Sequence, residues 1–413
     1  MKNLLLLIPS TSYRADYFLQ AAERLNLNVV VACDQHQTLE KTVSGKLLTL
    51  DFHNLEQSTE KVLSFAEQYP IAAVVPTEEE ATLLAVALSK ALSLPHNQMD
   101  AVAATRDKHL LRKRLIAAGI PTPSFQIYSC VNTFEETTPE INYPLVLKPT
   151  FLSGSQGVIR ANNPDEFQSA WLRIKKLLET PDMVRRGGTA ADKILVESYI
   201  PGKEFALEGL LQGGRLKTLA IFDKPDPLEG PFFEETLYIT PSRLSYKHQK
   251  ELINCTQKGT NALGLTEGPI HAELRLNDQG SFIIEIAARS IGGRCSRILQ
   301  FQTGYALEEI ILRHVLNVPI PSLERAQEAA GVMMIPIPSE GRLIAVDDIE
   351  KAKSVSGITD IEITLRRNQE VIPLPEGRSY LGFIFARGKT AEGVETALRT
   401  AQRQLSIQIR QRL

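Results

Sequence analysis

The sequence is short of the features that stabilise small secreted domains or mark zinc-binding modules. Its 413 residues include four cysteines, which are far apart and form no CxxC pair, so neither a disulfide framework nor a cysteine-bound zinc site is expected. Long apolar runs are also missing. The opening MKNLLLLIPS has a run of five apolar residues before its proline, fewer than the roughly 7–15 of a signal-peptide core. We therefore expect a buried first strand, no membrane segment and a cytoplasmic protein with reduced cysteines.

The chain also has little net charge and no Gly-x-Gly-x-x-Gly motif. Its 46 lysines and arginines nearly balance 48 aspartates and glutamates, so the formal charge of −2 creates no basic field for nucleic acid. No glycine-rich fingerprint follows the first expected strand, so a dinucleotide site is poorly supported. What is present is an apolar fraction of 43%, enough for the cores of several domains of roughly 100–200 residues each.

The N-terminal part alternates short apolar runs with helical stretches. Residues 4–8, 28–32, 46–50 and 72–75 read as strands, and residues 15–25, 55–68 and 79–92 read as helices. This alternation predicts a parallel sheet with helices on its faces, an α/β domain over residues 1–105. Ser10-Thr11-Ser12 and Thr77-Glu78-Glu79 follow two of the strands, at the edge where such sheets bind ligands. These polar groups, Glu78 among them, are candidates for substrate contacts, with helix capping as the alternative.

The remainder of the chain has a different pattern of expected strands and helices. A helix over residues 107–118 ends at a Gly-Ile-Pro stop, and residues 143–316 read as strands joined by tight turns, with a long helix over 164–179. The polar stretch 180–193 is expected to be a mobile loop. We expect a second domain over residues 106–318, with a lid subdomain at about 143–202. A small α+β cap over residues 319–413, after Pro319, would contain a strand IEITLR and a last helix over 391–408.

The stretch VLKPTFLSGSQGV places a lysine at the end of an apolar strand and a glycine-bearing loop directly after it. In a P-loop the order is reversed, with the glycines before the lysine. The loop Gly154-Ser155-Gln156-Gly157 lets backbone N–H groups approach an anion closely. Together with Lys148 this loop is a candidate polyphosphate site. The alternative is a solvated lysine at a sheet edge.

Two glutamates are predicted to face each other in the hairpin PIHAELRLNDQGSFIIEIAAR. Strand alternation puts Glu273 on one face with His271, and puts Glu285 on one face with Ile283. A three-residue turn at Asp278–Gly280 would pair Glu273 directly with Glu285. Facing carboxylates repel unless a cation lies between them, and Mg²⁺ prefers such oxygen ligands. The alternative is a solvated sheet face on which the glutamates pair with arginines.

A third stretch, KILVESYIPGKEFALEGLL, contains a connector between two strands. One strand ends at Glu197 and the next begins near Glu204, with Ser198-Tyr199-Ile200-Pro201-Gly202 between them. Unpaired backbone donors and acceptors in such a connector can bind an adenine edge, and Glu204 can accept a hydrogen bond from a ribose hydroxyl. By itself this signal is weak.

In order and spacing these residues resemble the ATP-grasp superfamily, from the N-terminus to about residue 315. The set is specific, although no single member is. The resemblance implies an ATP-grasp fold, with an N-terminal parallel-sheet α/β domain, a two-subdomain ATP-binding core and a small C-terminal α+β cap. It also implies that Lys108 and Lys148 contact the phosphates and that the loop of Gly154, Ser155, Gln156 and Gly157 closes over them. Glu197 and the backbone of Ser198, Tyr199 and Ile200 would hold adenine, Glu204 the ribose, and Glu273 and Glu285 the magnesium ions.

One residue departs from the usual ATP-grasp pattern, and other segments indicate one group within the superfamily. Many members have an asparagine two residues after the second metal glutamate, where this chain has Ala287. The segment EIAAR, the C-terminal GVMMIPIPSEG and the stretch IFDKPDPLEGPFFEE, with Lys224, are similar to the L-amino acid ligases, which join two amino acids through an acyl phosphate. With alanine at position 287, phosphate oxygens or water would complete the coordination of a second metal ion.

The resemblance implies an ADP-forming carboxylate–amine ligase, with amino acids as substrates. A substrate carboxylate would attack the γ-phosphorus of ATP, and an amine would then displace phosphate from the acyl phosphate. Lys148 and Arg289 would be catalytic, Arg289 by clamping the transferred phosphoryl group, and a salt bridge to Glu285 is the alternative for Arg289. His271 is a weak candidate for the base.

Two other classes stay open, a bicarbonate-dependent carboxylase or carbamoyl-phosphate-type enzyme and a non-catalytic nucleotide-binding protein. No carrier-like segment supports the first, and the presence of both metal carboxylates argues against the second. We expect ATP and Mg²⁺ as cofactors, with Mn²⁺ as an alternative metal, and small-molecule carboxylate and amine substrates. Neither nucleic acid nor a membrane is expected as a partner, and a homodimer is one option for the assembly.

Overall fold

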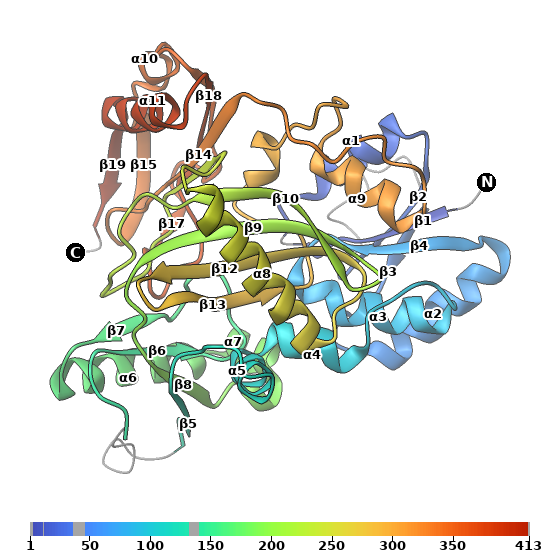
Figure 1. Ribbon diagram of the computed structural model, residues 1–413, viewed down its shortest axis with the longest axis horizontal. Helices are drawn as coiled ribbons and strands as arrows, with labels where there is room; N and C mark the ends of the chain where they lie inside the picture. Colours follow the sequence, from blue (N-terminus) through green and yellow to red (C-terminus); the bar gives the residue numbers. More distant parts are fainter. Residues whose placement is uncertain (1–2, 11, 36–45, 132–139, 412–413) are drawn as a thin grey trace.

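The computed structural model describes residues 3–10, 12–35, 46–131 and 140–411 (Figure 1). Its N-terminal part is a parallel sheet in the order β3-β2-β1-β4, which confirms the predicted α/β architecture. The strands are β1 (Asn3–Leu7), β2 (Asn28–Cys33), β3 (Lys46–Thr49) and β4 (Ile71–Pro76), and the helices are α1 (Ala15–Arg24), α2 (Leu55–Gln68) and α3 (Thr82–Ala91).

The apolar opening of the chain forms an inner strand of this sheet. In β1, Leu4 and Leu6 pack into one core, whereas Leu5 and Leu7 pack into another. Side chains alternate across a strand and apolar cores cover both faces here, so a continuous apolar run is needed rather than an alternating one. The predicted buried first strand is therefore confirmed.

A second, eight-stranded sheet crosses the middle of the molecule in the order β13-β12-β9-β10-β11-β14-β18-β16 (Figure 1). On one of its faces the helices α4 (Met99–Arg106), α5 (Lys108–Ala117) and α8 (Tyr246–Leu263) pack with β9, β10, β12 and β13 in one core. This sheet contains strands from both sides of the expected domain boundary at residue 319, because β14 pairs with β11. The strands are β9 (Lys203–Gln212), β10 (Arg215–Asp223), β11 (Leu237–Thr240), β12 (Gly268–Asn277), β13 (Gly280–Ala287), β14 (Ala329–Ile335), β16 (Ile358–Ile363) and β18 (Gly382–Gly388).

A third sheet, in the order β5-β8-β6-β7, forms the lid with the helix α6 (Pro164–Leu178). Its strands are β5 (Phe125–Ser129), β6 (Leu145–Pro149), β7 (Ile159–Ala161) and β8 (Lys193–Ser198). The expectation of a loop over residues 180–193 is wrong in its secondary structure. Residues Pro181–Gly187 form the helix α7, followed by a 3-10 turn at Gly188–Ala190. Proline at the first helical position and Asp182 paired with Arg185 favour this helix.

The C-terminal end of the chain also differs from the prediction. The last helix, α11 (Ala391–Gln404), ends before residue 408, and Ser406–Arg410 form the strand β19 beside β15 (Gly341–Asp347). In SIQIR the isoleucines are half-buried while their neighbours are exposed, which is the period of a strand rather than a helix. β17 (Glu370–Val371) completes this three-stranded sheet, and α10 (Ile349–Lys353) follows β15.

Two expectations from composition can be checked directly. No helix in the described part of the chain combines the length and apolarity that crossing a membrane requires. All four cysteines are buried and free, as expected for reduced thiols.

Candidate active site

One cleft of about 670 Å³ collects most of the predicted site residues. It is lined by the N-terminal sheet edge, the lid, the eight-stranded sheet and the loop before β18. The sheet-edge candidates Ser10, Ser12 and Thr77 do not line it, and neither do two of the predicted ligand residues. Gly157 donates its backbone N–H to the carbonyl oxygen of Pro375, and Lys224 is buried behind the carboxylates. The predicted residues that line the cleft are Glu78, Lys108, Lys148, Gly154, Ser155, Gln156, Glu197, Ser198, Tyr199, Ile200, Glu204, His271, Glu273, Glu285 and Arg289.

Glu273 and Glu285 are paired across β12 and β13, as predicted, but the turn that joins these strands is shorter than predicted. Asn277 pairs with Gly280, which leaves a two-residue turn, and the register shifts between Glu273 and Leu274. The extra residue in β13 is Ile284, which lines the cleft, while Ile283 packs in the core on the opposite face. The placement of Ile283 beside Glu285 is therefore wrong, because a bulge reverses the alternation at that point.

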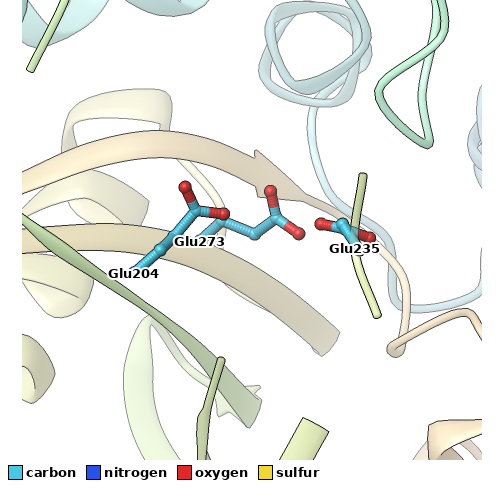
Figure 2. A group of neighbouring side chains, drawn as sticks. All are labelled: Glu204, Glu235 and Glu273. Carbon is cyan, nitrogen blue, oxygen red and sulfur yellow. The ribbon is translucent and has the colours of Figure 1, made fainter. Parts of the chain in front are cut away.

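A cluster of three carboxylates surrounds Lys224. Oxygens of Glu204, Glu235 and Glu273 lie within 4.8 Å of one another (Figure 2). The ammonium of Lys224 is 2.6 Å from Glu204, 2.6 Å from Glu235 and 3.3 Å from Glu273. Although burial opposes it, these carboxylates raise the pKa of Lys224, whereas burial and the charge of Glu273 raise the pKa of Glu235 to about 7. Sequence reasoning missed Glu235, whose only signal was the acidic pair that ends IFDKPDPLEGPFFEE.

The donor set suits a hard divalent cation. Carboxylate oxygens are the ligands that Mg²⁺ prefers, and it usually takes one or two of them with water and substrate phosphate. Glu273 and Glu285 both line the cleft, and Glu285 lies 3.3 Å from the ammonium of Lys108, so positive charge already balances part of the pair. The carboxylates present fit a magnesium ion.

The two predicted phosphate lysines are held by different acids. Lys108, at the start of α5, donates to the carbonyl oxygen of Leu152 at 2.5 Å and pairs with Glu285. Lys148, at the end of β6, lies 2.5 Å from the carboxylate of Glu197. Burial lowers the pKa of Lys148 to about 8, although Glu197 opposes this shift.

Glu197 has a structural partner that the sequence did not reveal. The guanidinium of Arg112, fully buried on α5, donates to Glu197 at 2.7 Å and to the carbonyl oxygen of Ile284 at 2.9 Å. Burial opposes it, but Arg112 and Lys148 together lower the pKa of Glu197. Its carboxylate thus holds Arg112 and Lys148 in place, and any contact with adenine would be an additional one.

The connector after β8 is held in place by Arg275. Its guanidinium donates to the carbonyl oxygen of Ile200 at 2.7 Å and to Glu204 at 3.0 Å, and it also bonds the carbonyl oxygen of Leu228. The ring of Tyr199 lies 5.1 Å from the Arg275 guanidinium carbon. The backbone of the connector is therefore fixed, while Glu204, the predicted ribose ligand, is shared with the carboxylate cluster.

Arg289 forms an ion pair with a residue of the N-terminal domain rather than with one of its own hairpin. Its guanidinium is 3.0 Å from Glu79, which decides against the alternative of a salt bridge to Glu285. Burial opposes it, but the charges of Glu79 and Glu285 raise the pKa of Arg289. The neighbouring Glu78 accepts a hydrogen bond from Ser12 at 2.8 Å, while Thr11 lies outside the described residues. The sheet edge predicted to touch substrate thus reaches the cleft.

His271 lies between two acids, which bears on its expected role as a base. Nδ1 is 3.5 Å from Glu208 and Nε2 is 3.6 Å from Glu273. Burial opposes protonation, but these two carboxylates raise the pKa of His271 to about 9. At neutral pH the imidazole is therefore protonated on both nitrogens, and in this form it is poorly suited to accept a further proton.

Two domain families match the chain. The ATP-grasp domain matches residues 141–298, and the L-amino acid ligase C-terminal domain 2 matches residues 333–410. The crystal structure of an L-amino acid ligase from Bacillus licheniformis superposes with a TM-score of 0.86 at 26% identity, over 99% of each chain.

Curated relatives agree with these matches. Dapdiamide A synthase from Enterobacter agglomerans is 27% identical over 73% of this chain and 72% of its own length. Alanine–anticapsin ligase from Bacillus subtilis (strain 168) is 26% identical over 57% of this chain, and the match spans about half, 52%, of that ligase. With the paired carboxylates and lysines in one cleft, these matches establish that the chain contains an ATP-grasp domain over residues 141–298 and an L-amino acid ligase C-terminal domain 2 over residues 333–410.

Proposed function

We propose that this protein joins a carboxylic acid to an amine, with at least one amino-acid substrate, and forms ADP and phosphate by way of an acyl phosphate. The observation that carries the proposal is the continuity of one cleft. It extends from the connector at Ile200, past Lys148 and Glu285, to Arg289 and the N-terminal sheet edge. A nucleotide and an acid can therefore lie end to end in a single enclosure, which suits in-line transfer of a phosphoryl group.

ATP would lie with its adenine against the connector after β8 and its phosphates near Lys108 and Lys148. Val146, Tyr199 and Ile284 supply apolar surface on that side of the cleft. The loop Gly154-Ser155-Gln156-Gly157 has positive φ at both glycines and at Ser155. Such backbone turns aim successive N–H groups at an anion, and glycine adopts them at little cost.

Glu273 and Glu285 would hold magnesium, and Glu204 or Glu235 could contribute through the shared cluster. When bound, the ion would neutralise negative charge that develops on the phosphate oxygens. The ammonium groups of Lys108 and Lys148 would act on the same charge. These protein groups are already in place, so little reorganisation is needed as the phosphoryl group moves.

Arg289 would clamp the transferred phosphoryl group or the acyl phosphate. Its guanidinium has a fixed partner in Glu79, so its orientation is set before substrate arrives. An amine then attacks the acyl carbon, the bond to the phosphate oxygen breaks, and phosphate leaves with the electron pair. Because an α-amino group has a pKa near 7.7–8.0, a neutral fraction is available at physiological pH without a dedicated base. Solvent can take the proton that the new amide loses.

The test is ADP and phosphate release with pairs of amino acids, with the product identified by mass. Condensed product with ADP is the expected result. Formation of AMP and pyrophosphate would contradict an acyl phosphate. ADP that forms only with bicarbonate would assign the chain to the carboxylases, and no turnover with any acid would favour a nucleotide-binding protein.

A further inference from the structure

Two arginines that take no part in the steps above line the same cleft from different parts of the chain. Arg186 comes from α7 of the lid, and Arg378 comes from the loop before β18. Among the described residues, Arg378 has no hydrogen-bond or ion-pair partner. In the part of the chain that the structure describes, Arg186 has only Asp182 as an ion-pair partner, at 3.6 Å from its Nη1, and that buried nitrogen lacks a hydrogen-bond acceptor.

These two guanidinium groups lie close enough to affect each other. Burial first, and then the positive charge of Arg378, lower the pKa of Arg186, while Asp182 and Glu80 oppose the shift. Like charges beside a partly buried wall cost free energy unless an anion lies between them. The described residues supply no acceptor for the enclosed nitrogen, so the pair has unused capacity for an anionic ligand.

The approach of the two arginines is fixed by contacts between the lid and the segment before Arg378. The N–H of Gly157 donates to the carbonyl oxygen of Pro375 at 2.8 Å, and the Gln156 amide donates to that of Glu376 at 2.7 Å. The carboxylate of Glu376 also accepts two hydrogen bonds, both 2.8 Å, from Arg173 on α6. These contacts therefore bring the lid, which carries Arg186, against the segment that leads to Arg378.

Different charged residues act most strongly on Arg186 and on the phosphate lysine Lys148. The charges that act most on Lys148 are those of Glu197 and Arg112, with Lys108 beyond them. Those that act on Arg186 are Arg378, Asp182 and Glu80. Glu80 follows Glu79, the partner of Arg289, so Arg186 lies toward the N-terminal sheet edge that also holds Arg289. A second substrate would enter from that end.

We propose that Arg186 and Arg378 bind the carboxylate of the amine substrate, so that the acyl group is passed to a free amino acid rather than to a simple amine. The inference rests on the proposed function. A guanidinium binds a carboxylate through two parallel N–H donors, and two of them orient it more strictly than one. With its carboxylate held there, the amino acid points its amine toward the acyl phosphate at Arg289. The arginines position the nucleophile and exchange no proton.

The experiment compares three acceptors in the full-length enzyme with ATP and magnesium. Hydroxylamine captures the acyl phosphate as a hydroxamate and needs no carboxylate. The second acceptor is each of the common L-amino acids, and the third is the matching amino-acid carboxamide. The acid is whichever amino acid gives hydroxamate with the unmodified enzyme. We compare Arg186→Ala, Arg378→Ala and Arg378→Lys with the control Arg185→Ala, whose side chain is 75% exposed on the same helix and pairs only with Asp182.

In the two alanine variants the KM for the free amino acid should rise about tenfold or more, the usual effect of losing a charge-assisted hydrogen bond. Hydroxamate formation, the KM for ATP and turnover of the carboxamide should stay near those of Arg185→Ala, and Arg378→Lys should recover part of the loss. Equal losses with amino acid and carboxamide would overturn the inference. So would a raised KM for ATP with hydroxylamine, because the arginines would then serve phosphate. An unmodified enzyme that makes hydroxamate from no acid would refute the proposed function itself.

Discussion

Glu273 and Glu285 lie directly opposite each other across β12 and β13, and the bulge at Ile284 puts them there. From the two-residue turn alone, Glu273 would face Ile284 and the second carboxylate would point into the core. The added residue restores the pairing and turns Ile284 toward the cleft, where it lines the predicted adenine side. Bulges that re-aim a side chain are frequent beside functional sites.

Glu285→Gln should lower the rate of ADP formation by about 10²–10³, the usual cost of losing one preorganised charge at a transferring group. Nucleotide affinity should fall much less, because the connector and both lysines remain. Stopped assays of ADP release and equilibrium binding of a non-hydrolysable ATP analogue measure the two effects. The control is Glu350→Gln, whose side chain is 90% exposed. Equal losses of affinity and rate would contradict the assignment.

Arg289→Ala should also stall ADP formation, and Glu79→Gln in the same chain should not restore it. Removing Arg289 alone leaves the partly buried Glu79 carboxylate without its partner, so part of any loss could reflect stability. In the double variant that unpaired charge is gone. If the double variant regained activity per folded molecule, the role of Arg289 would be structural.

Arg112→Leu should destabilise the fold. The substitution removes the partner of the buried Glu197 carboxylate, and breaking a buried pair typically costs about 3–5 kcal/mol. The midpoint of thermal unfolding should fall by several degrees. Arg114→Leu is the control, since Arg114 lies on the same helix and pairs with the largely exposed Asp100. Similar midpoints for the two variants would contradict a stabilising role for the Arg112–Glu197 pair.

Nucleotide binding should weaken as the pH rises from 7 to 9. The folded protein holds the pKa of Lys148 at about 8, mainly through burial, so the ammonium is charged below that pH and loses its proton above it. ATP favours the charged form. Arg289 stays charged in this window because, although burial opposes it, the charges of Glu79 and Glu285 raise its pKa. In Lys148→Arg the guanidinium keeps its charge throughout, so the dependence should flatten. Parallel pH profiles of the dissociation constant for both proteins would contradict this.

Hydrogen exchange should show closure of the lid. The Gly154-Ser155-Gln156-Gly157 loop and residues 180–193 should exchange faster without nucleotide and become protected with ATP and magnesium. Glu376→Ala removes the acceptor for Arg173, a half-exposed pair whose loss costs little stability, and should speed exchange in this loop. Equal protection with and without nucleotide would rule out a closing lid.

Local pattern was enough to predict much of this protein. A run of four leucines predicted an inner strand and strand–helix alternation predicted a parallel sheet, and both are confirmed. A lysine before a glycine-bearing loop predicted a phosphate site, which stays a prediction. These features depend on residues that are close together in the sequence, because side-chain periodicity and backbone freedom determine structure over a few residues. The same is true of the acidic hairpin, whose two glutamates were paired correctly even though the turn was assigned one residue too long.

Other features depend on tertiary structure because they join residues that no local pattern connects. Arg112 reaches Glu197 across 85 positions, Arg289 reaches Glu79 across 210, and Gln156 reaches Glu376 across 220. Glu235 becomes part of the carboxylate cluster only because β11 lies two strands from β9. The bulge at Ile284 likewise places Ile283 in the core beneath α8. Sequence periodicity determined which side chains could share a face, but packing between distant segments decided which charges meet in the cleft.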